Sequence, residues 1–465
     1  MGNAVPKLDG MTLSPTDASS QSARKRAHHS HESDEQSEIV EEAAPRQKIR
    51  KTSLYIYETM FVQGANADVV IAALGKEWRL HRIYLCQSSY FSALFNGNWK
   101  DSNDSRIEIE ILDPNITKEA LHATFGSLYK DDVTLTTDEV VSVLATSRML
   151  QVEGLLEQCI GFMTSHITPE VVCVFYQAAR EYGLESVELQ CFEWLQQRLM
   201  TAQSVTLLKE LSGELLLRLV VSPKLFVMQV EMDLYTLVKE WLYLQLFPNS
   251  TVSDIVQLQK EADAHFSSLK SGEFLDTEAG KPYRDIFKGI RFQHIINDAS
   301  SVRILDRESI IPQSWLLPLY KKQWQKMLKV NQKQDHGPSM NEDVFDATCI
   351  RCGRILQQNG EYCWRWTGYL FGFDVLVSFS NGFIFFKRNT YSQPCLSSVS
   401  LQSKRAIALK VTAASFDASG RPTFKKSTDF IRVVFAPDEE VLVMTLEKPV
   451  RFPLHLSVSM ALVSE

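Results

Sequence analysis

Two of the eight cysteines have the spacing of metal ligands. Cys349 and Cys352 form a CxxC pair, and Cys363 and Cys395 follow downstream. Four thiolates can bind zinc tetrahedrally, so a zinc site is one interpretation of this segment. The second pair lacks the CxxC spacing, however, and Cys363 lies within an aromatic run. Buried free thiols acting as small apolar side chains are therefore favoured, and no metal and no cofactor are predicted.

Other candidates for chemistry are few. The sequence has no GxGxxG after a strand, no P-loop, no HExxH and no GxSxG. His81 is a candidate general base, but no acid, base or nucleophile is arranged with it. Trp364 and Trp366 could form a ligand cage, although alternating aromatic residues on a strand belong more often to a core or an interface. No catalytic residue and no enzymatic activity are predicted.

Residues 1–52 form a polar tail with few aromatic residues. An acidic run from Glu32 to Glu42 separates two basic clusters. This composition cannot bury a core, so the tail is predicted to be disordered. The basic clusters resemble nuclear localisation signals, and their residues are Arg24, Lys25, Arg26, Lys48, Arg50 and Lys51. We therefore expect nuclear localisation, with a merely solvated tail as the alternative.

The N-terminus also resembles a lipidation site. Met1-Gly2-Asn3 begins like a myristoylation motif, which makes Gly2 a candidate acceptor, but Pro6 stands where that motif has Ser or Thr. One acyl chain holds a membrane only marginally unless a second signal, such as a basic cluster, contributes. A membrane-associated or cytoplasmic pool is therefore a secondary expectation.

The bulk composition narrows the class of protein. The 465 residues are 45% hydrophobic and 23% charged, the balance of an ordinary globular protein of two or three domains. The net charge of −7 does not favour direct binding of nucleic acid. No apolar run approaches the length of a membrane span, and no apolar N-terminal signal segment is found.

The strongest structural signal runs from Asp68 to Lys100. It predicts a strand, a glycine turn, a second strand and two helices, which together make a compact α+β unit. From Thr168 the periodicity is helical, and beyond a polar linker it changes to short strands typical of a β-sandwich or barrel. The predicted fold class is therefore α+β multidomain. The predicted boundaries are 1–52 for the tail, 53–166 for the α+β domain, 167–328 for an all-α domain, 329–345 for the linker and 346–465 for an all-β, sandwich-like domain.

The α+β unit resembles a BTB (POZ) domain. The residues that carry this resemblance are Asp68, Gly75, His81, Arg82, Leu85, Ser89, Tyr90, Phe91 and Phe95. BTB domains are dimerisation and docking modules, and the resemblance makes His81 a structural residue. The following helices resemble a BACK domain in Leu225–Trp241 and in Gly289–Phe292, with a longer polar insertion at about 248–282.

The order of domains, together with Gly360–Gly368 and Phe385–Asn389, resembles the germ cell-less family. Members of that family look like substrate adaptors of cullin-3 ubiquitin ligases, acting at the nuclear envelope or nuclear matrix in germ-cell development and spermatogenesis. The resemblance implies three partners: cullin-3, a second copy of the chain through the BTB domain, and a protein substrate through the C-terminal β-domain. Nuclear-envelope proteins are further candidate partners.

The BTB resemblance also implies docking residues. Those expected at the dimer interface are Tyr55, Ile56, Met60 and Phe61. Those expected to face cullin-3 are Phe95, Asn96, Trp99 and Tyr129. Adaptors often carry a hydrophobic-x-acidic sequence after this helix, and Phe95-Asn96-Gly97 lacks the acidic residue. The alternative function is a nuclear-envelope scaffold or a transcriptional co-repressor partner that never binds a cullin.

Overall fold

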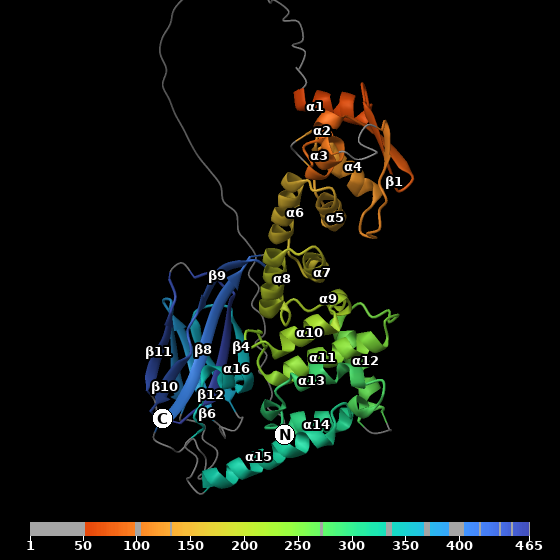
Figure 1. The fold of residues 1–465 in the computed structure, drawn as a ribbon. Coiled ribbons are helices and arrows are strands. Elements are labelled where there is room, and N and C mark those ends of the chain that lie inside the picture. Colours follow the sequence, from red (N-terminus) through yellow and green to blue (C-terminus); the bar gives the residue numbers. More distant parts are fainter. Residues whose placement is uncertain are drawn as a thin grey trace, which may run out of the picture. The chain divides into compact units, whose positions relative to one another are not determined.

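The computed structural model shows three consecutive folded regions (Figure 1). We call them the N-terminal unit (52–167), the helical region (168–348) and the β-domain (349–464). The model describes residues 52–97, 104–130, 133–269, 273–331, 337–366, 373–389, 404–417, 420–436, 439–447 and 450–464. No helix in these ranges is long and apolar enough to cross a membrane.

The N-terminal unit is built on a three-stranded sheet with the order β2-β1-β3. β1 (Val69–Ala73) and β2 (Lys76–Leu80) form an antiparallel hairpin, and β3 (Arg106–Glu108) pairs in parallel with β1. The alternating pattern of residues 106–111 predicted a longer strand, but β1 ends at Ala73 and leaves the later residues without a partner strand. The helices are α1 (Thr52–Ile56), the π-helix η1 (Tyr57–Val62), α2 (Arg82–Leu85), α3 (Ser89–Asn96), α4 (Lys118–Ser127), α5 (Val140–Met149) and α6 (Glu153–Ser165).

The helical region packs around α11 (Glu231–Leu246), whose Trp241 is 1% exposed and donates its indole N–H to the carbonyl of Leu211 (2.8 Å). The α-helices before and after it are α7 (Val172–Glu181), α8 (Glu185–Arg198), α9 (Val205–Glu210), α10 (Gly213–Val221), α12 (Ile255–Ser267), α13 (Arg284–Lys288), α14 (Ala299–Glu308), α15 (Gln313–Asn331) and α16 (Glu342–Thr348). Three short 3₁₀ helices complete it: η3 (Phe274–Asp276), η4 (Lys281–Tyr283) and η5 (Phe292–His294). The range 329–345, predicted as a linker, therefore includes the end of α15 and the start of α16, because helical hydrogen bonding extends into it from both sides.

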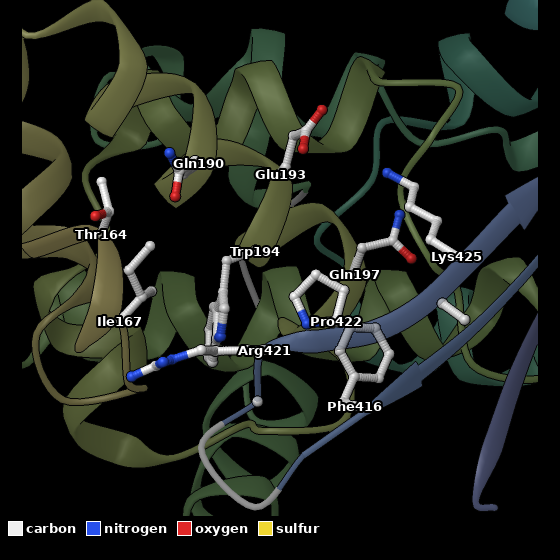
Figure 2. Close-up of a pocket in the computed structure, with 12 residues that line it drawn as sticks. Thr164, Ile167, Gln190, Glu193, Trp194, Gln197, Phe416, Arg421, Pro422 and Lys425 are labelled. Carbon is white, nitrogen blue, oxygen red and sulfur yellow. The ribbon is translucent and has the colours of Figure 1, made fainter. Parts of the chain in front are cut away.

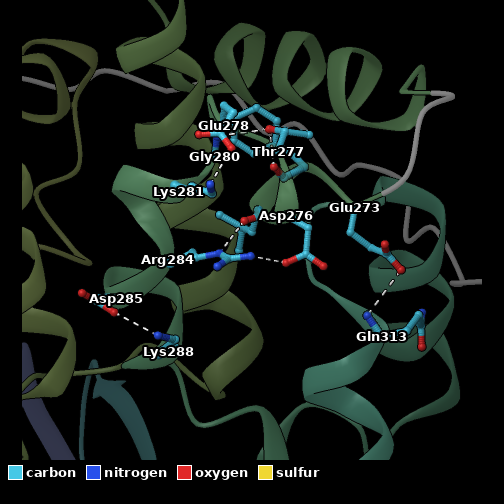
Figure 3. Close-up of polar contacts among 12 residues, drawn as sticks. Glu273, Asp276, Thr277, Glu278, Gly280, Lys281, Arg284, Asp285, Lys288 and Gln313 are labelled. Carbon is cyan, nitrogen blue, oxygen red and sulfur yellow. Dashed lines mark hydrogen bonds and ion pairs between the residues drawn. The ribbon is translucent and has the colours of Figure 1, made fainter.

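The polar insertion predicted at about 248–282 is folded where the structure describes it. α12 occupies its first half, and a cluster of ion pairs holds the segment around η3 and η4 (Figure 3). Arg284 donates to the carbonyl of Leu275 (2.7 Å) and pairs with Asp276, while Gln313 N–H of α15 donates to Glu273 (3.4 Å). Buried Leu258 and Phe266 of α12 and Leu275 of η3 anchor the segment in the core, and the charge pairs lie at its surface.

The β-domain is a sandwich of two antiparallel sheets, and the predicted fold class is confirmed. One sheet has the order β10-β8-β12-β4 with β9 also paired to β8, and the other has the order β11-β7-β6-β5. Facing apolar side chains such as Val377 and Val458 form the core between them. The strands are β4 (Ile350–Leu356), β5 (Gly360–Trp366), β6 (Phe373–Ser380), β7 (Phe383–Asn389), β8 (Arg405–Phe416), β9 (Pro422–Ser427), β10 (Ile431–Phe435), β11 (Glu440–Thr445) and β12 (Leu454–Leu462).

A buried charge cluster joins α11 to β4. Glu231, at the start of α11, is 0% exposed, and Arg351 of β4 is 1% exposed. Arg351 Nε donates to Glu231 Oε2 (3.2 Å), Nη2 pairs with the other carboxylate oxygen, and Nη1 donates to the carbonyls of Val220 (2.9 Å) and Ser222 (3.0 Å). The backbone N–H of Arg291 donates to Glu231 Oε1 (3.1 Å). Each buried charge is therefore paired and hydrogen-bonded, as burial of ions requires.

Electrostatics in this cluster favour the ionised carboxylate. Burial alone would raise the pKa of Glu231, but the charges and hydrogen bonds of Arg351 and Arg291 outweigh it, and the net pKa is lowered. A carboxyl with a lowered folded-state pKa stabilises the fold at neutral pH. That contribution is lost as the pH falls through the folded-state pKa.

Replacing Arg351 with Met is expected to destabilise the protein strongly. Glu231 would stay buried without its bidentate partner, and breaking a buried pair in this way costs about 3–5 kcal/mol. Calorimetric unfolding should show a lower transition temperature. Arg106→Met, which removes an exposed pair with Glu77, is the matched control and should leave the transition in place. Equal unfolding temperatures for the two variants would contradict a stabilising role for the buried cluster.

Candidate protein-docking site

Helix α3 is held to the N-terminal unit by its cap and by one aromatic side chain. Ser88 precedes the helix, accepts a hydrogen bond from the backbone N–H of Phe91 (3.3 Å), and donates to the carbonyl of Leu150. Phe91 is 0% exposed and packs in the core. The opposite side of α3, with Ala93 and Asn96, faces solvent. The Ser-x-x-Phe pattern thus presents a rigid helix face to the outside.

Asp68 and Arg82 fix the start of α2. The Asp68 carboxylate accepts from the backbone N–H of Arg82 (2.8 Å), which is an unpaired donor in the first turn of that helix. The Arg82 guanidinium lies over the ring of Phe95, 4.5 Å from its centroid, and donates to the carbonyl of Asp104 (2.7 Å). Phe95, partly buried and also stacked on Phe91 at 5.8 Å, is therefore held on two sides by its own chain.

His81 has the structural role that the resemblance implied. Its Nε2 lies 2.8 Å from the carbonyl of Ala65, and its Nδ1 lies 3.1 Å from the hydroxyl of Tyr129. That hydroxyl also accepts from the backbone N–H of His81 (3.0 Å). A proton on Nε2 satisfies the whole network, since Nε2 then donates to Ala65 and Tyr129 donates to Nδ1. Burial raises the pKa of Tyr129 to about 12, so the phenol stays protonated.

The structure corrects one of the four residues expected to face cullin-3. Tyr129 is 4% exposed, stacks on Tyr84 at 4.3 Å, and uses its hydroxyl on His81, so it belongs to the core. Asn96 is exposed on α3, and Phe95 is partly exposed beside it. Trp99 lies outside the described residues.

One of the four expected dimer residues is also corrected. Phe61 is 5% exposed and packs against His122 and Tyr129, so the structure places it in the core of its own chain. Ile56 and Met60 are half-buried against the same core. Tyr55, by contrast, is 56% exposed on α1.

The N-terminal unit also has features that the sequence interpretation missed. Ile83 on α2 is 78% exposed and Leu112 is 86% exposed, although both stand in otherwise apolar patterns. A hydrophobic-x-acidic sequence does follow α3, as Trp99-Lys100-Asp101, two positions beyond Gly97. Searching the whole segment after the helix, instead of its last residues alone, would have found it.

The CxxC cysteines lie in different clusters of the β-domain. Cys349 packs with Phe345 and accepts from Arg291 Nη1 (2.9 Å), while Cys352 packs between the sheets. Burial raises the pKa of both thiols, that of Cys352 to about 12, which disfavours the thiolate that binds metal. Among the described residues no three His, Cys, Asp or Glu side chains are grouped as a metal site. Cys395 and the side chains of Cys363, Trp364 and Trp366 lie outside the described part, as do Gly2 and all six residues of the basic clusters.

The fold and this surface define a BTB-domain protein that carries a helical region and a β-sandwich. The BTB/POZ domain family model matches residues 57–167. The chain is 48% identical over 417 residues to mouse "Germ cell-less protein-like 1", covering 88% of this chain and 79% of that protein. It is 32% identical over 445 residues to Drosophila melanogaster "Protein germ cell-less", covering 90% and 78%. Human "Kelch-like protein 6" is 24% identical over 185 residues, covering 40% of this chain and 29% of that protein.

The chain belongs to the germ cell-less family. The resemblance found in the sequence is thereby confirmed.

Replacing Tyr129 with Phe is expected to destabilise the N-terminal unit while leaving its shape intact. The variant removes only the hydroxyl, so the buried N–H and Nδ1 of His81 lose their partner at a cost of about 1–3 kcal/mol. Chemical denaturation followed by fluorescence measures the loss. Tyr90→Phe is the control, because no hydrogen bond of the Tyr90 hydroxyl is found among the described residues. If both variants unfold alike, the His81–Tyr129 network contributes nothing to stability.

Proposed function

We propose that this chain is a non-catalytic, substrate-specific adaptor of a cullin-3 RING ubiquitin ligase. One observation carries the proposal: a BTB unit presents the outer face of α3 to solvent while the inner face of that helix is locked into the core. A partner can therefore bind this face without rearranging the unit. The BTB/POZ family match over residues 57–167 and the partial match to a Kelch-like protein support the same conclusion.

In this function each region has one task. The N-terminal unit binds cullin-3 through Asn96, Phe95 and the segment of Trp99, and it dimerises through the helix of Tyr55. The helical region holds the β-domain in a fixed orientation through the Glu231–Arg351 cluster. The β-domain binds the protein substrate. Catalysis is positional, because holding a substrate lysine near a ubiquitin-loaded enzyme raises its effective concentration.

The proposed place of action is the nucleus, at the nuclear envelope or nuclear matrix, in germ-cell development and spermatogenesis. The family membership and the basic clusters at Arg24–Arg26 and Lys48–Lys51 support this proposal. Acylation of Gly2 would add a membrane-associated pool.

Asn96→Arg tests the cullin contact. A long charged side chain at this exposed position, the last residue of α3, should clash with a docked partner. The affinity for the N-terminal domain of cullin-3 should fall by about tenfold or more, which is about 1.4 kcal/mol. Isothermal titration calorimetry with the full chain measures it.

The matched control is Gln257→Arg on the exposed side of α12, which adds the same charge away from the N-terminal unit. It should bind like the unsubstituted chain. If Asn96→Arg binds normally, the contact lies on another surface. If the unsubstituted chain never binds cullin-3, a nuclear-envelope scaffold or co-repressor partner becomes the better assignment.

Tyr55→Asp tests the dimer. A charge at this exposed aromatic position would be buried without a partner in an interface, so the mass measured by light scattering should change from that of a dimer to that of a monomer. Leu189→Asp places the same charge at an apolar residue of α8 that is 59% exposed, and this control should stay dimeric. If the Tyr55→Asp variant dimerises with unchanged affinity, α1 is not part of the dimer interface.

A further inference from the structure

A cavity of about 290 Å³ lies between α8 and the turn that joins β8 to β9 (Figure 2). Its apolar lining comes from both sides, with Trp194 of α8 facing Phe416 and Pro422 of the β-domain. This volume is near the lower limit of about 300 Å³ for ligand pockets, enough for one or two side chains.

The floor of the cavity contains an unpaired donor. Trp194 is 6% exposed, and its indole Nε1 is buried without a hydrogen-bond partner. Gly420, at φ +80°, keeps the space beside this nitrogen open, since a Cβ there would lie 3.0 Å from it. Leaving a buried N–H unpaired is unfavourable, and a carbonyl oxygen entering the cavity would supply the missing acceptor.

The rim of the cavity carries the polar groups that an extended peptide needs. Gln190 and Gln197 lie on α8, one on each side of Trp194 along the helix, and their amides can both donate and accept. On the β-domain side the rim carries Arg421 and Lys425, neither of which has an ion pair among the described residues. With Glu193 as the one acidic lining residue, the rim has a net positive charge.

We propose that this cavity binds an extended peptide segment of a partner protein. The segment places one apolar side chain against Trp194 and Phe416, offers a backbone carbonyl to the indole N–H, and directs an adjacent Asp or Glu toward Lys425. This inference rests on the proposed function, because the segment would be the recognition sequence of the substrate. An apolar pocket alone would not select an acidic neighbour, whereas the Lys425 amine at one end of the pocket does.

The experiment is a selection from a phage library of random linear peptides on the full-length chain. Enriched sequences should contain an apolar residue followed within one or two positions by Asp or Glu. Fluorescence polarisation with one labelled enriched peptide then compares variants. Lys425→Glu should weaken binding by about tenfold or more, because it replaces attraction of the acidic residue by repulsion.

Lys426→Glu is the matched control. It makes the same charge change one residue further along β9, where the side chain points to the opposite face of the strand and does not line the cavity. Its affinity should stay within about twofold, a change of no more than about 0.4 kcal/mol. Trp194→Phe removes only the N–H and its ring edge, and should weaken binding by about three- to tenfold. Since Lys425 is exposed, its variant tests the site even if Trp194→Phe fails to fold.

Two outcomes overturn the inference. The selection enriches no such sequence, or the enriched peptides bind Lys425→Glu and Trp194→Phe as well as the unsubstituted chain. Cullin-3 binding is measured independently, so the two failures can be told apart. A chain that binds cullin-3 but selects no peptide overturns the pocket alone. A chain that selects the peptide but never binds cullin-3 overturns the ligase function alone.

Discussion

The bidentate pair between Glu231 and Arg351 is the constraint on which the rest of this structure depends. A fully buried carboxylate must be matched by donors in fixed directions, whereas apolar contacts tolerate sliding. Arg351 also binds the carbonyls of Val220 and Ser222 at the end of α10. The Arg351 side chain of β4 therefore fixes the position of the β-domain relative to both α10 and α11.

The contacts around this pair continue the same junction. Gln229 N–H donates to the carbonyl of Gly353 (3.1 Å), and a Cβ at Gly353 would lie 2.5 Å from the carbonyl of Val227. Backbone meets backbone here, so the strand has room only for glycine. An adaptor that holds a substrate at a set distance from an enzyme needs such rigidity. The cavity beside Trp194 also lies between the helical region and the β-domain.

The N-terminal unit separates structural from docking residues in a consistent way. Four polar side chains form hydrogen bonds with backbone atoms of the same unit: those of Asp68, His81, Ser88 and Tyr129. These hydrogen bonds stabilise the fold of the unit, and His81, Ser88 and Tyr129 are buried. Asn96 and Tyr55 are exposed and can bind one. A signature residue in such a domain is therefore evidence for the fold, and its less constrained neighbours are the better candidates for contacts.

Local patterns allowed much of the fold to be predicted from the sequence. The order of the three regions and the hairpin at Gly75 depend on residues a few positions apart. These local patterns could not predict which aromatic side chains are buried. Phe61 and Tyr129 were expected at interfaces because the BTB resemblance implied it, yet packing against His122 and His81 places them in the core of the chain.

Periodicity and short motifs predict most of the helices and strands and the family that the chain resembles, because these signals lie in residues close together in the sequence. Which distant residues meet depends on the tertiary structure. Glu231 and Arg351 are separated by 120 positions, and the pocket joins Trp194 to Lys425. No local spacing predicts such pairs, because they form only when the helical region and the β-domain pack together and their buried polar groups hydrogen-bond across the junction.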